Sequence, residues 1–364
     1  MIKGIYTPNV VPFKENGKIN EEELRKMTEW LIQKGIHGLY PNGSTGEFIR
    51  LSFEERKEVV RIMADQARGR VPILAGAAES NMDQIMDACK FYADLGCIAV
   101  SITGPYYFKV SQQSIEHWFR EIAKKSPIDI LLYNIPQFSN EIELPVVKRL
   151  ALDCPKIVGI KDSSRDLPRF LNTLNEIKPQ RADFSCLIGC EEILYPSLFM
   201  GGDGGTIATS GVVPEVLVKL HEAYVSGQHE EGRRIQMKLL ELINTMLLGI
   251  NFPEGFRAGV SLRGFDVGPA RQPLSPAERP VLDELRTKVA CILTECGFSE
   301  AAQACRVGAK VKGCGCGCNG EKANATGTCA NGAGGFGASK NGGTPNPEDV
   351  SRIVREILQQ LSGR

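Results

Sequence analysis

The sequence predicts a (β/α)8 barrel, a TIM barrel, followed by a helical segment. Short apolar segments alternate with amphipathic ones through the first two thirds of the 364 residues. The repeat is about 30 residues long, as expected of a strand, a helix and their connections. Polar and aromatic side chains follow several apolar segments, where a barrel carries its reactive groups. An open doubly wound sheet is the alternative, but the chain contains no glycine fingerprint of a dinucleotide-binding turn.

Eight segments have the apolar composition of parallel strands that are covered on both faces. Because the carboxyl ends of barrel strands meet at one mouth, the residues that follow these segments are expected to lie together. The segments are residues 4–10, 38–41, 72–77, 98–103, 130–134, 157–161, 185–189 and 204–208.

The first two predicted helices have clear start signals. Residues 20–34 begin with Asn20 as a cap before an acidic first turn. Residues 52–67 begin with Ser52 and Glu55, which have the spacing of a capping box.

Residues 212–300 are expected to be helical. Val213, Pro214 and Glu215 would start one helix, and residues 230–248 form a long amphipathic stretch. Ser275 followed by Pro276 predicts another start, with serine as the cap and proline at the first helical position.

Residues 157–161 are the most informative strand, because the apolar segment ends in Lys161. Burial at this point would disfavour the ammonium and lower the pKa of the lysine. The neutral amine could then add to a ketone as a Schiff base. The alternative is a lysine that simply leaves the strand for solvent.

Two further segments carry groups suited to the same chemistry. Tyr133 lies near the end of an apolar strand, and its hydroxyl can both donate and accept a proton. Ser44 and Thr45 lie in a turn after another strand, where hydroxyls and backbone amides can bind a carboxylate. The alternatives are a core aromatic for Tyr133 and an ordinary capped turn at Ser44 and Thr45.

Together these segments resemble the dihydrodipicolinate synthase and N-acetylneuraminate lyase family of pyruvate-dependent class I aldolases. The resemblance covers residues 1–297, where we expect one catalytic domain with C-terminal helices packed beside the barrel. The motifs that carry it are GSTGE at 43–47, YNIP at 133–136, GIKDSS at 159–164 and the tyrosine pair Tyr106 and Tyr107.

This resemblance implies a role for several residues. Lys161 would form the Schiff base with pyruvate, and Tyr133 would relay protons. Ser44 and Thr45 would hold the pyruvate carboxylate. Tyr107 would reach into the site of a neighbouring subunit, because members of the family assemble as homotetramers. The chemistry needs no cofactor, and the spacing of the four histidines does not predict a metal site.

The aldehyde partner is less clear from the sequence. Family members that condense pyruvate with aspartate semialdehyde have an arginine where this chain has Phe138. A phenyl ring cannot replace a bidentate carboxylate clamp, which favours a lyase of 2-oxo acids or sugar acids over that synthase. A catalytically silent scaffold or 2-oxo-acid sensor is a third possibility.

Four residues are candidates for binding the rest of the substrate. Glu191 and Glu192 follow the seventh strand, at the place where sugar-acid lyases of the family present carboxylates to hydroxyl groups. The alternative for this pair is the acidic first turn of the next helix. The resemblance also implies Ser163, which occupies the position of a hydroxyl residue that contacts the sugar chain in those lyases, and Thr206 completes the set.

Charge and hydropathy exclude several classes of protein. The 43 basic and 43 acidic residues cancel, which leaves no electrostatic basis for binding nucleic acid or an anionic membrane. No apolar stretch is long enough to cross a bilayer, and the N-terminus lacks a secretory leader, so we expect a cytoplasmic protein. Twelve cysteines in such a protein indicate reduced thiols.

Residues 298–345 are rich in glycine, asparagine and cysteine and are predicted to be a flexible linker. Cys314, Cys316 and Cys318 alternate with glycine and could bind zinc or an iron–sulfur cluster. Their spacing lacks the paired CxxC motif of zinc sites, so a reactive or unstructured segment is the other interpretation.

Residues 346–364 are predicted to form a short amphipathic helix that begins with Asn346 and Pro347. A helix of this length needs a partner for its apolar face. The segment resembles the encapsulation peptides that carry enzymes into bacterial microcompartments, which implies shell proteins as the partner. Docking on its own barrel or on a neighbouring subunit is the alternative.

Overall fold

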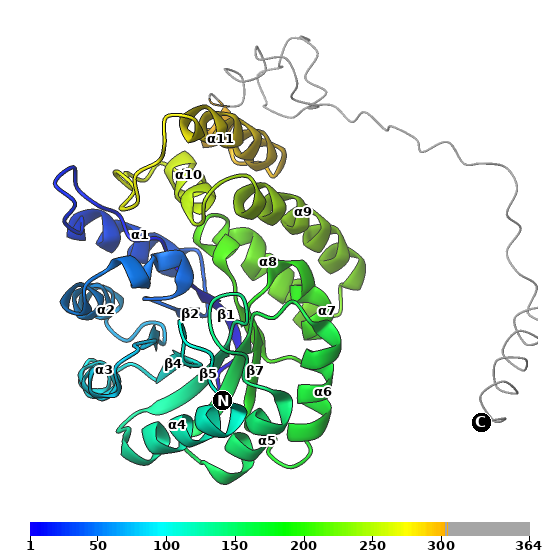
Figure 1. Ribbon diagram of the computed structural model, residues 1–364. Helices are drawn as coiled ribbons and strands as arrows, with labels where there is room; N and C mark the ends of the chain where they lie inside the picture. The colour runs from blue at the N-terminus through cyan, green and yellow to red at the C-terminus, as the bar shows by residue number, and fades with distance from the viewer. Residues whose placement is uncertain (303, 305–364) are drawn as a thin grey trace, which may run out of the picture. The chain divides into compact units, whose positions relative to one another are not determined.

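A computed structural model describes residues 1–302 and 304 of the chain. Eight parallel strands form one sheet in the order β2-β1-β8-β7-β6-β5-β4-β3. A parallel bridge between Leu39 and Ile73 brings the two outer strands together, so the sheet curves into a barrel (Figure 1). The strands are β1 Gly4–Thr7, β2 Gly38–Leu39, β3 Leu74–Gly76, β4 Ala99–Thr103, β5 Asp129–Asn134, β6 Ile157–Asp162, β7 Ser185–Ile188 and β8 Gly204–Thr206. The predicted (β/α)8 architecture is confirmed.

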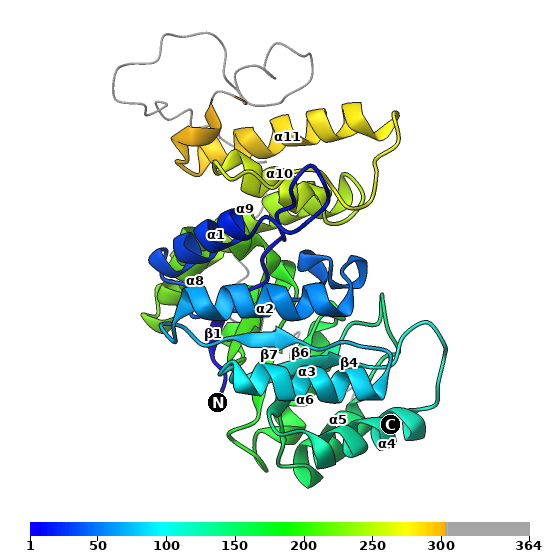
Figure 2. The ribbon, with the colours of Figure 1, turned by 90° about the vertical axis from the view of Figure 1, so that its left-hand side faces the viewer.

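Helices alternate with the strands and surround them, and three more follow the last barrel helix. Figure 2 shows these last helices stacked beyond α1, at one side of the barrel. The predicted C-terminal helical segment therefore packs beside the barrel. The helices are α1 Glu21–Gln33, α2 Phe53–Ala67, α3 Met82–Asp94, α4 Gln112–Lys125, α5 Leu144–Asp153, α6 Leu167–Ile177, α7 Leu194–Phe199, α8 Pro214–Val225, α9 His229–Leu248, α10 Glu254–Leu262 and α11 Glu278–Glu295.

The first two helices begin as their sequences predict. The Asn20 side chain accepts a hydrogen bond from the backbone N–H of Glu23 at the start of α1. At the start of α2, Ser52 and Glu55 each accept a hydrogen bond from the other's backbone N–H, at 3.2 and 2.8 Å. This reciprocal capping box satisfies N–H groups that have no partner inside the helix.

The predicted start of α11 is wrong. The helix begins at Glu278, with Ala277 in the capping position, instead of at Pro276. The Glu278 carboxylate accepts a hydrogen bond from the backbone N–H of Ser275 at 2.7 Å. Residues 275–278 therefore form a separate turn, and the helix starts only at its last residue.

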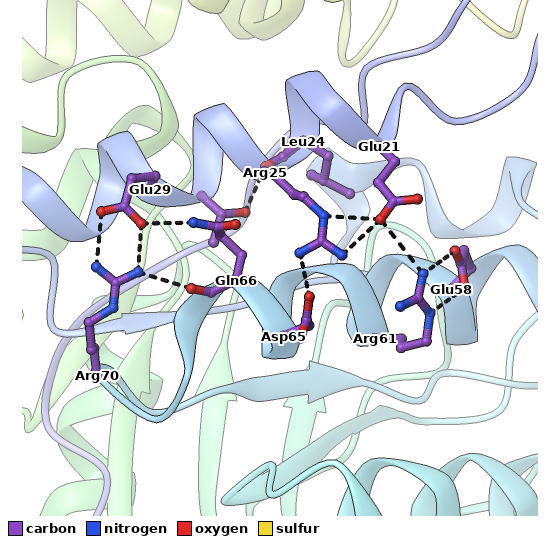
Figure 3. Close-up of polar contacts among 10 residues, drawn as sticks. Glu21, Leu24, Arg25, Glu29, Glu58, Arg61, Asp65, Gln66 and Arg70 are labelled. Carbon is purple, nitrogen blue, oxygen red and sulfur yellow. Dashed lines mark hydrogen bonds and ion pairs between the residues drawn. The ribbon is translucent and has the colours of Figure 1, made fainter.

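Ion pairs join α1 to α2 across their outer surfaces (Figure 3). Arg25 donates to Glu21 within α1 and to Asp65 of α2, with 2.6 Å to the aspartate. Arg70, just after α2, donates to both carboxylate oxygens of Glu29 at 2.9 and 2.5 Å. Exposed pairs of this kind stabilise a fold by about 0.2–1 kcal/mol each. These ion pairs hold α1 against α2. The connection that carries Ser44 and Thr45 leads from β2 into α2.

The barrel interior contains its own apolar layer, separate from the larger core between strands and helices. Successive strand residues point to opposite faces, so only alternate residues enter this layer. In register, Tyr133 of β5 pairs with Lys161 of β6, and Lys161 pairs with Leu187 of β7. The interior layer consists of Ile2, Tyr6, Tyr40, Leu74, Ala99, Leu131 and Leu187.

No helix within residues 1–302 and 304 is long and apolar enough to cross a membrane. Among the cysteines of the same region, Cys291 is disulfide-bonded, so the prediction of reduced thiols is wrong at that position. Free thiols occur at Cys89, Cys97, Cys154, Cys186, Cys190 and Cys296.

The predictions for the C-terminal tail lie outside the described residues. They concern the cysteines at 314, 316 and 318 and the amphipathic helix at 346–364. The boundaries at 297/298 and 345/346 likewise stay predictions.

Candidate active site

Lys161 lies inside the barrel with its amine between two aromatic rings. The residue is 4% exposed. Its Nζ is 3.9 Å from the ring centre of Tyr133 and 4.4 Å from that of Tyr40. The Tyr40 ring is held in place because its hydroxyl donates to Ser101 Oγ of β4 at 2.9 Å. Two aromatic faces therefore hold the amine in place and stabilise positive charge on it.

Gly189, just after β7, leaves room for this lysine. A Cβ at this position would overlap the Ser163 hydroxyl oxygen and would lie 2.9 Å from Lys161 Cε. Real Cβ atoms essentially never approach that closely. The glycine is therefore required by close approach of side chains.

The turn between β2 and α2 brings Ser44 next to Tyr133. A short 3₁₀ helix, η1 Ser44–Gly46, follows Gly43. The Ser44 and Tyr133 hydroxyl oxygens are 3.4 Å apart, so they can exchange a proton directly. Thr45 is buried beside them. The convergence of Ser44, Tyr133 and Lys161 that the sequence predicted is present in the structure.

These residues line one cavity of ≈ 150 Å³ at the mouth of the barrel. Every predicted substrate-binding residue lines it. Thr206, at the end of β8, is buried, and its hydroxyl makes no hydrogen bond within the described part of the chain. The lining residues are Pro8, Ser44, Thr45, Tyr133, Ile135, Gln137, Phe138, Lys161, Ser163, Arg165, Gly189, Cys190, Glu191, Glu192, Thr206, Ala208, Ile243, Leu247, Phe252 and Phe256.

Tyr107 is the one predicted site residue that does not line this cavity. It is 91% exposed, and its backbone has a left-handed conformation with φ of 75°. Its ring packs edge-on against Phe108, with 4.9 Å between ring centres. The insertion of Tyr107 into a neighbouring subunit's site stays a prediction.

The two glutamates after β7 differ in their surroundings. Glu191 is 4% exposed, and its Oε1 accepts a hydrogen bond from the backbone N–H of Thr209 at 2.8 Å. Glu192 lies nearer the mouth and forms an ion pair with Arg165, with 3.1 Å between Oε1 and Nε. Both glutamates lie in a short 3₁₀ helix before α7, so they line the cavity and also form an acidic helical turn.

Residues 1–293 match the family model described as the dihydrodipicolinate synthetase family. The chain belongs to the dihydrodipicolinate synthetase family. It is 32% identical over 298 residues to an uncharacterized DapA-like lyase of Thermofilum pendens, and the match covers 81% of this chain and 97% of that protein. A 4-hydroxy-tetrahydrodipicolinate synthase of Methanopyrus kandleri is 33% identical over 290 residues, with 79% and 95% covered.

Solved structures of the family have the same fold. YagE, an E. coli K12 prophage protein of the dihydrodipicolinic acid synthase family crystallised with pyruvate, superposes with a TM-score of 0.76 at 27% identity. That match covers 80% of this chain and 99% of the other. A dihydrodipicolinate synthase of Thermotoga maritima gives a TM-score of 0.76 at 28% identity, with 82% and 99% covered. Enzymes of this family are class I carbon–carbon lyases that form a Schiff base with pyruvate, and this protein has that class of activity.

The pKa of Lys161 results from opposing influences. Burial is the largest and lowers it, because an ammonium loses hydration inside the barrel. Electrostatic interactions with Tyr133 and Tyr40 and a hydrogen bond with Tyr133 act in the other direction and leave the pKa of Lys161 raised. The prediction of a lowered pKa is therefore wrong.

Burial also changes the pKa of Glu191 and raises it to about 7, mainly because a carboxylate is poorly solvated in the cavity wall. The hydrogen bond from Thr209 opposes this shift but does not cancel it. Near neutral pH a large share of Glu191 is therefore an uncharged acid, which can donate as well as accept a hydrogen bond.

Several residues of this family site were not predicted from the sequence. Tyr40 and Gly189 contact or make room for the lysine. Arg165 was missed because it lies beyond the end of β6, in a left-handed backbone conformation that no local pattern indicates. The apolar wall was also missed, and it comes from α9, the connection after it and α10 through Ile243, Leu247, Phe252 and Phe256.

Proposed function

We propose that the protein forms or cleaves a carbon–carbon bond between pyruvate and an aldehyde through a Schiff base on Lys161. The observation that carries this proposal is the buried Lys161 amine between Tyr133 and Tyr40, with Ser44 and Thr45 on the wall of the same cavity. Family membership supports the Schiff base, and the geometry supports these residues as the groups that form it.

In this mechanism the Lys161 ammonium loses a proton to the Tyr133 hydroxyl as that hydroxyl passes its own proton to Ser44, and the neutral amine then attacks the keto carbon of pyruvate. Tyr133 returns a proton to the carbinolamine oxygen, which leaves as water, and an iminium forms. Ser44, 3.4 Å from the Tyr133 hydroxyl, passes protons between that phenol and the cavity. Ser44 and Thr45 hold the pyruvate carboxylate.

The iminium accepts the electron pair that remains when a proton leaves the methyl carbon of pyruvate. The resulting enamine attacks the aldehyde carbon, and Tyr133 protonates the new alkoxide. Water then releases the 4-hydroxy-2-oxo acid from Lys161. Cleavage follows the same steps in reverse. Glu191, Glu192, Ser163 and Thr206 surround the space that the aldehyde would occupy.

A lyase of 2-oxo acids or sugar acids is the proposal that the cavity supports best. Phe138 lines the mouth where the synthases of the family have an arginine, so the carboxylate of aspartate semialdehyde finds no clamp there. Condensation with that aldehyde is the second candidate, since relatives such as the Methanopyrus kandleri protein are named as synthases.

Reduction with borohydride in the presence of pyruvate, followed by peptide mass mapping, tests this proposal. A pyruvate adduct on Lys161, absent from the Lys161→Arg variant, is expected. Lys178 pairs with Asp203 at a distance from the cavity and serves as the unmodified control. A folded wild-type protein without an adduct would contradict the proposed chemistry.

We further propose that the enzyme works as a homotetramer in which Tyr107 completes a neighbouring site, and that residues 346–364 bind the shell of a bacterial microcompartment. The exposure of Tyr107 supports the first point. Deletion of 346–364 should leave turnover intact and abolish shell association. Loss of turnover on that deletion would contradict the second point.

A further inference from the structure

The connection after β6 extends one wall of the cavity outward from the reactive amine. Lys161, Ser163 and Arg165 follow one another at intervals of two residues, and all three line the cavity. Strand pairing continues past the lysine, because the backbone N–H of Ser163 donates to Asn134 O at 2.8 Å. The strand itself ends at Asp162. Exposure rises from Lys161 at 4% and Ser163 at 7% to 48% for the side chain of Arg165, so Arg165 is the outermost of the three.

The backbone holds Arg165 in an unfavourable conformation. Its φ is 65°, in the left-handed region where residues other than glycine, asparagine and aspartate are uncommon. The backbone is fixed on both sides, because Ser164 N–H donates to Asp162 at 2.8 Å and Asp166 N–H donates to Ser164 at 3.2 Å. Glycine would occupy this position without strain. The arginine side chain is thus kept at the mouth in spite of a conformational cost.

The guanidinium group has unused donors. Its one ion pair among the described residues is that of Nε with Glu192, whereas a guanidinium carries five N–H donors. The side chain is 48% exposed. Phe138, which lines the same mouth, is 62% exposed and provides neither charge nor hydrogen bonds. Among the described residues, Lys161 and Arg165 are the cationic side chains that line this cavity.

We propose that Arg165 binds an anionic group, carboxylate or phosphate, at the far end of the aldehyde partner, and so makes the enzyme selective for short aldehydes with a terminal anion. This inference rests on the proposed aldolase function. The planar fork of donors suits both oxyanions. In the free enzyme Glu192 orients the guanidinium through Nε. In the complex the remaining N–H groups of Arg165 donate to the anionic group of the substrate.

Paired aldehydes that differ in charge test this inference. Pyruvate consumption is followed with butanal against succinic semialdehyde, and with glyceraldehyde against glyceraldehyde 3-phosphate. Wild-type kcat/KM should favour the anionic member of at least one pair by about tenfold or more. The pair that shows the preference distinguishes carboxylate from phosphate recognition.

The Arg165→Gly variant is the decisive one, because glycine relieves the left-handed backbone and the protein should melt no lower than the wild type. The anionic preference should fall by about tenfold or more in this variant. Arg149→Gln, on the outer surface where Arg149 pairs with Glu116, is the matched control and should keep the preference. A wild type that prefers neutral or polyhydroxy aldehydes, or an unchanged preference in Arg165→Gly, would overturn the inference. Absence of a pyruvate adduct in the wild type would instead overturn the aldolase function itself.

Discussion

Replacing Gly189 with alanine tests whether the space beside Lys161 determines the reactivity of its amine. The added Cβ would overlap Ser163 Oγ and lie 2.9 Å from Lys161 Cε, so the lysine side chain has to move. Overpacking a buried site costs about 1–3 kcal/mol, which lowers Tm by roughly 2–4 °C per kcal/mol in a large domain. A displacement of about 1 Å at a reacting group slows the reaction by about 100-fold.

The assay is the rate of borohydride trapping with pyruvate, measured beside the melting temperature. Gly211→Ala is the control, because the nearest atom to its Cβ, Pro8 O, lies at an ordinary 3.4 Å. A Gly189→Ala and Ser163→Ala double variant should recover stability but not the trapping rate, because the contact with Lys161 remains. Trapping by Gly189→Ala at the wild-type rate would refute the reasoning.

Three further outcomes follow from the structure. Tyr40→Leu should slow trapping by removing an aromatic face worth about 0.5–2 kcal/mol to a cation, and Tyr40→Phe should keep most of the rate because the ring remains. The pKa of Glu191 rises from 4.5 to about 7 on folding, so the folded state binds the extra proton and stability should fall as pH rises through that window. Glu191→Gln should remove this pH dependence. In denaturant titrations at pH above the window, the free energy of unfolding should then be higher than that of the wild type by up to about 3 kcal/mol. Burial and His37 lower the pKa of His221 from 6.5 to about 4, so stability should be lost as pH falls between these values, and His221→Gln should abolish that loss.

Patterns local to each segment predicted the fold and the reactive part of the site. All eight strands lie within the predicted segments or one residue beyond them, because buried parallel strands differ from amphipathic helices in composition as well as in period. The barrel then brings Ser44, Tyr133 and Lys161 together, since each follows or ends a strand. Local patterns failed at the start of α11, where the Glu278 side chain binds the chain before the helix.

The remaining features depend on what lies across the barrel and are not visible along the chain. Tyr40 follows the two-residue strand β2, which is too short to show which face is inside. Burial alone predicts the wrong direction for the pKa of Lys161, because the phenols that oppose it come from two other strands. Phe252, just before α10, and Phe256, within it, line the cavity although they lie far along the chain from Tyr133 and Lys161.

Helix α10 connects the two halves of the site. Phe256 belongs to the apolar wall of the cavity, and the next residue, Arg257, contacts the segment that follows Ser44 and Thr45. The Arg257 guanidinium donates to Val11 O at 2.8 Å and pairs with the buried Glu47 at 3.4 Å. Glu47 directly follows η1, which carries Ser44 and Thr45. Because both contacts come from adjacent residues of one helix, a substitution that tilts α10 should change the turn that carries Ser44 and Thr45 together with the apolar wall. Substitutions in the apolar wall that are meant to admit another substrate should therefore succeed only in variants that retain Arg257 and Glu47.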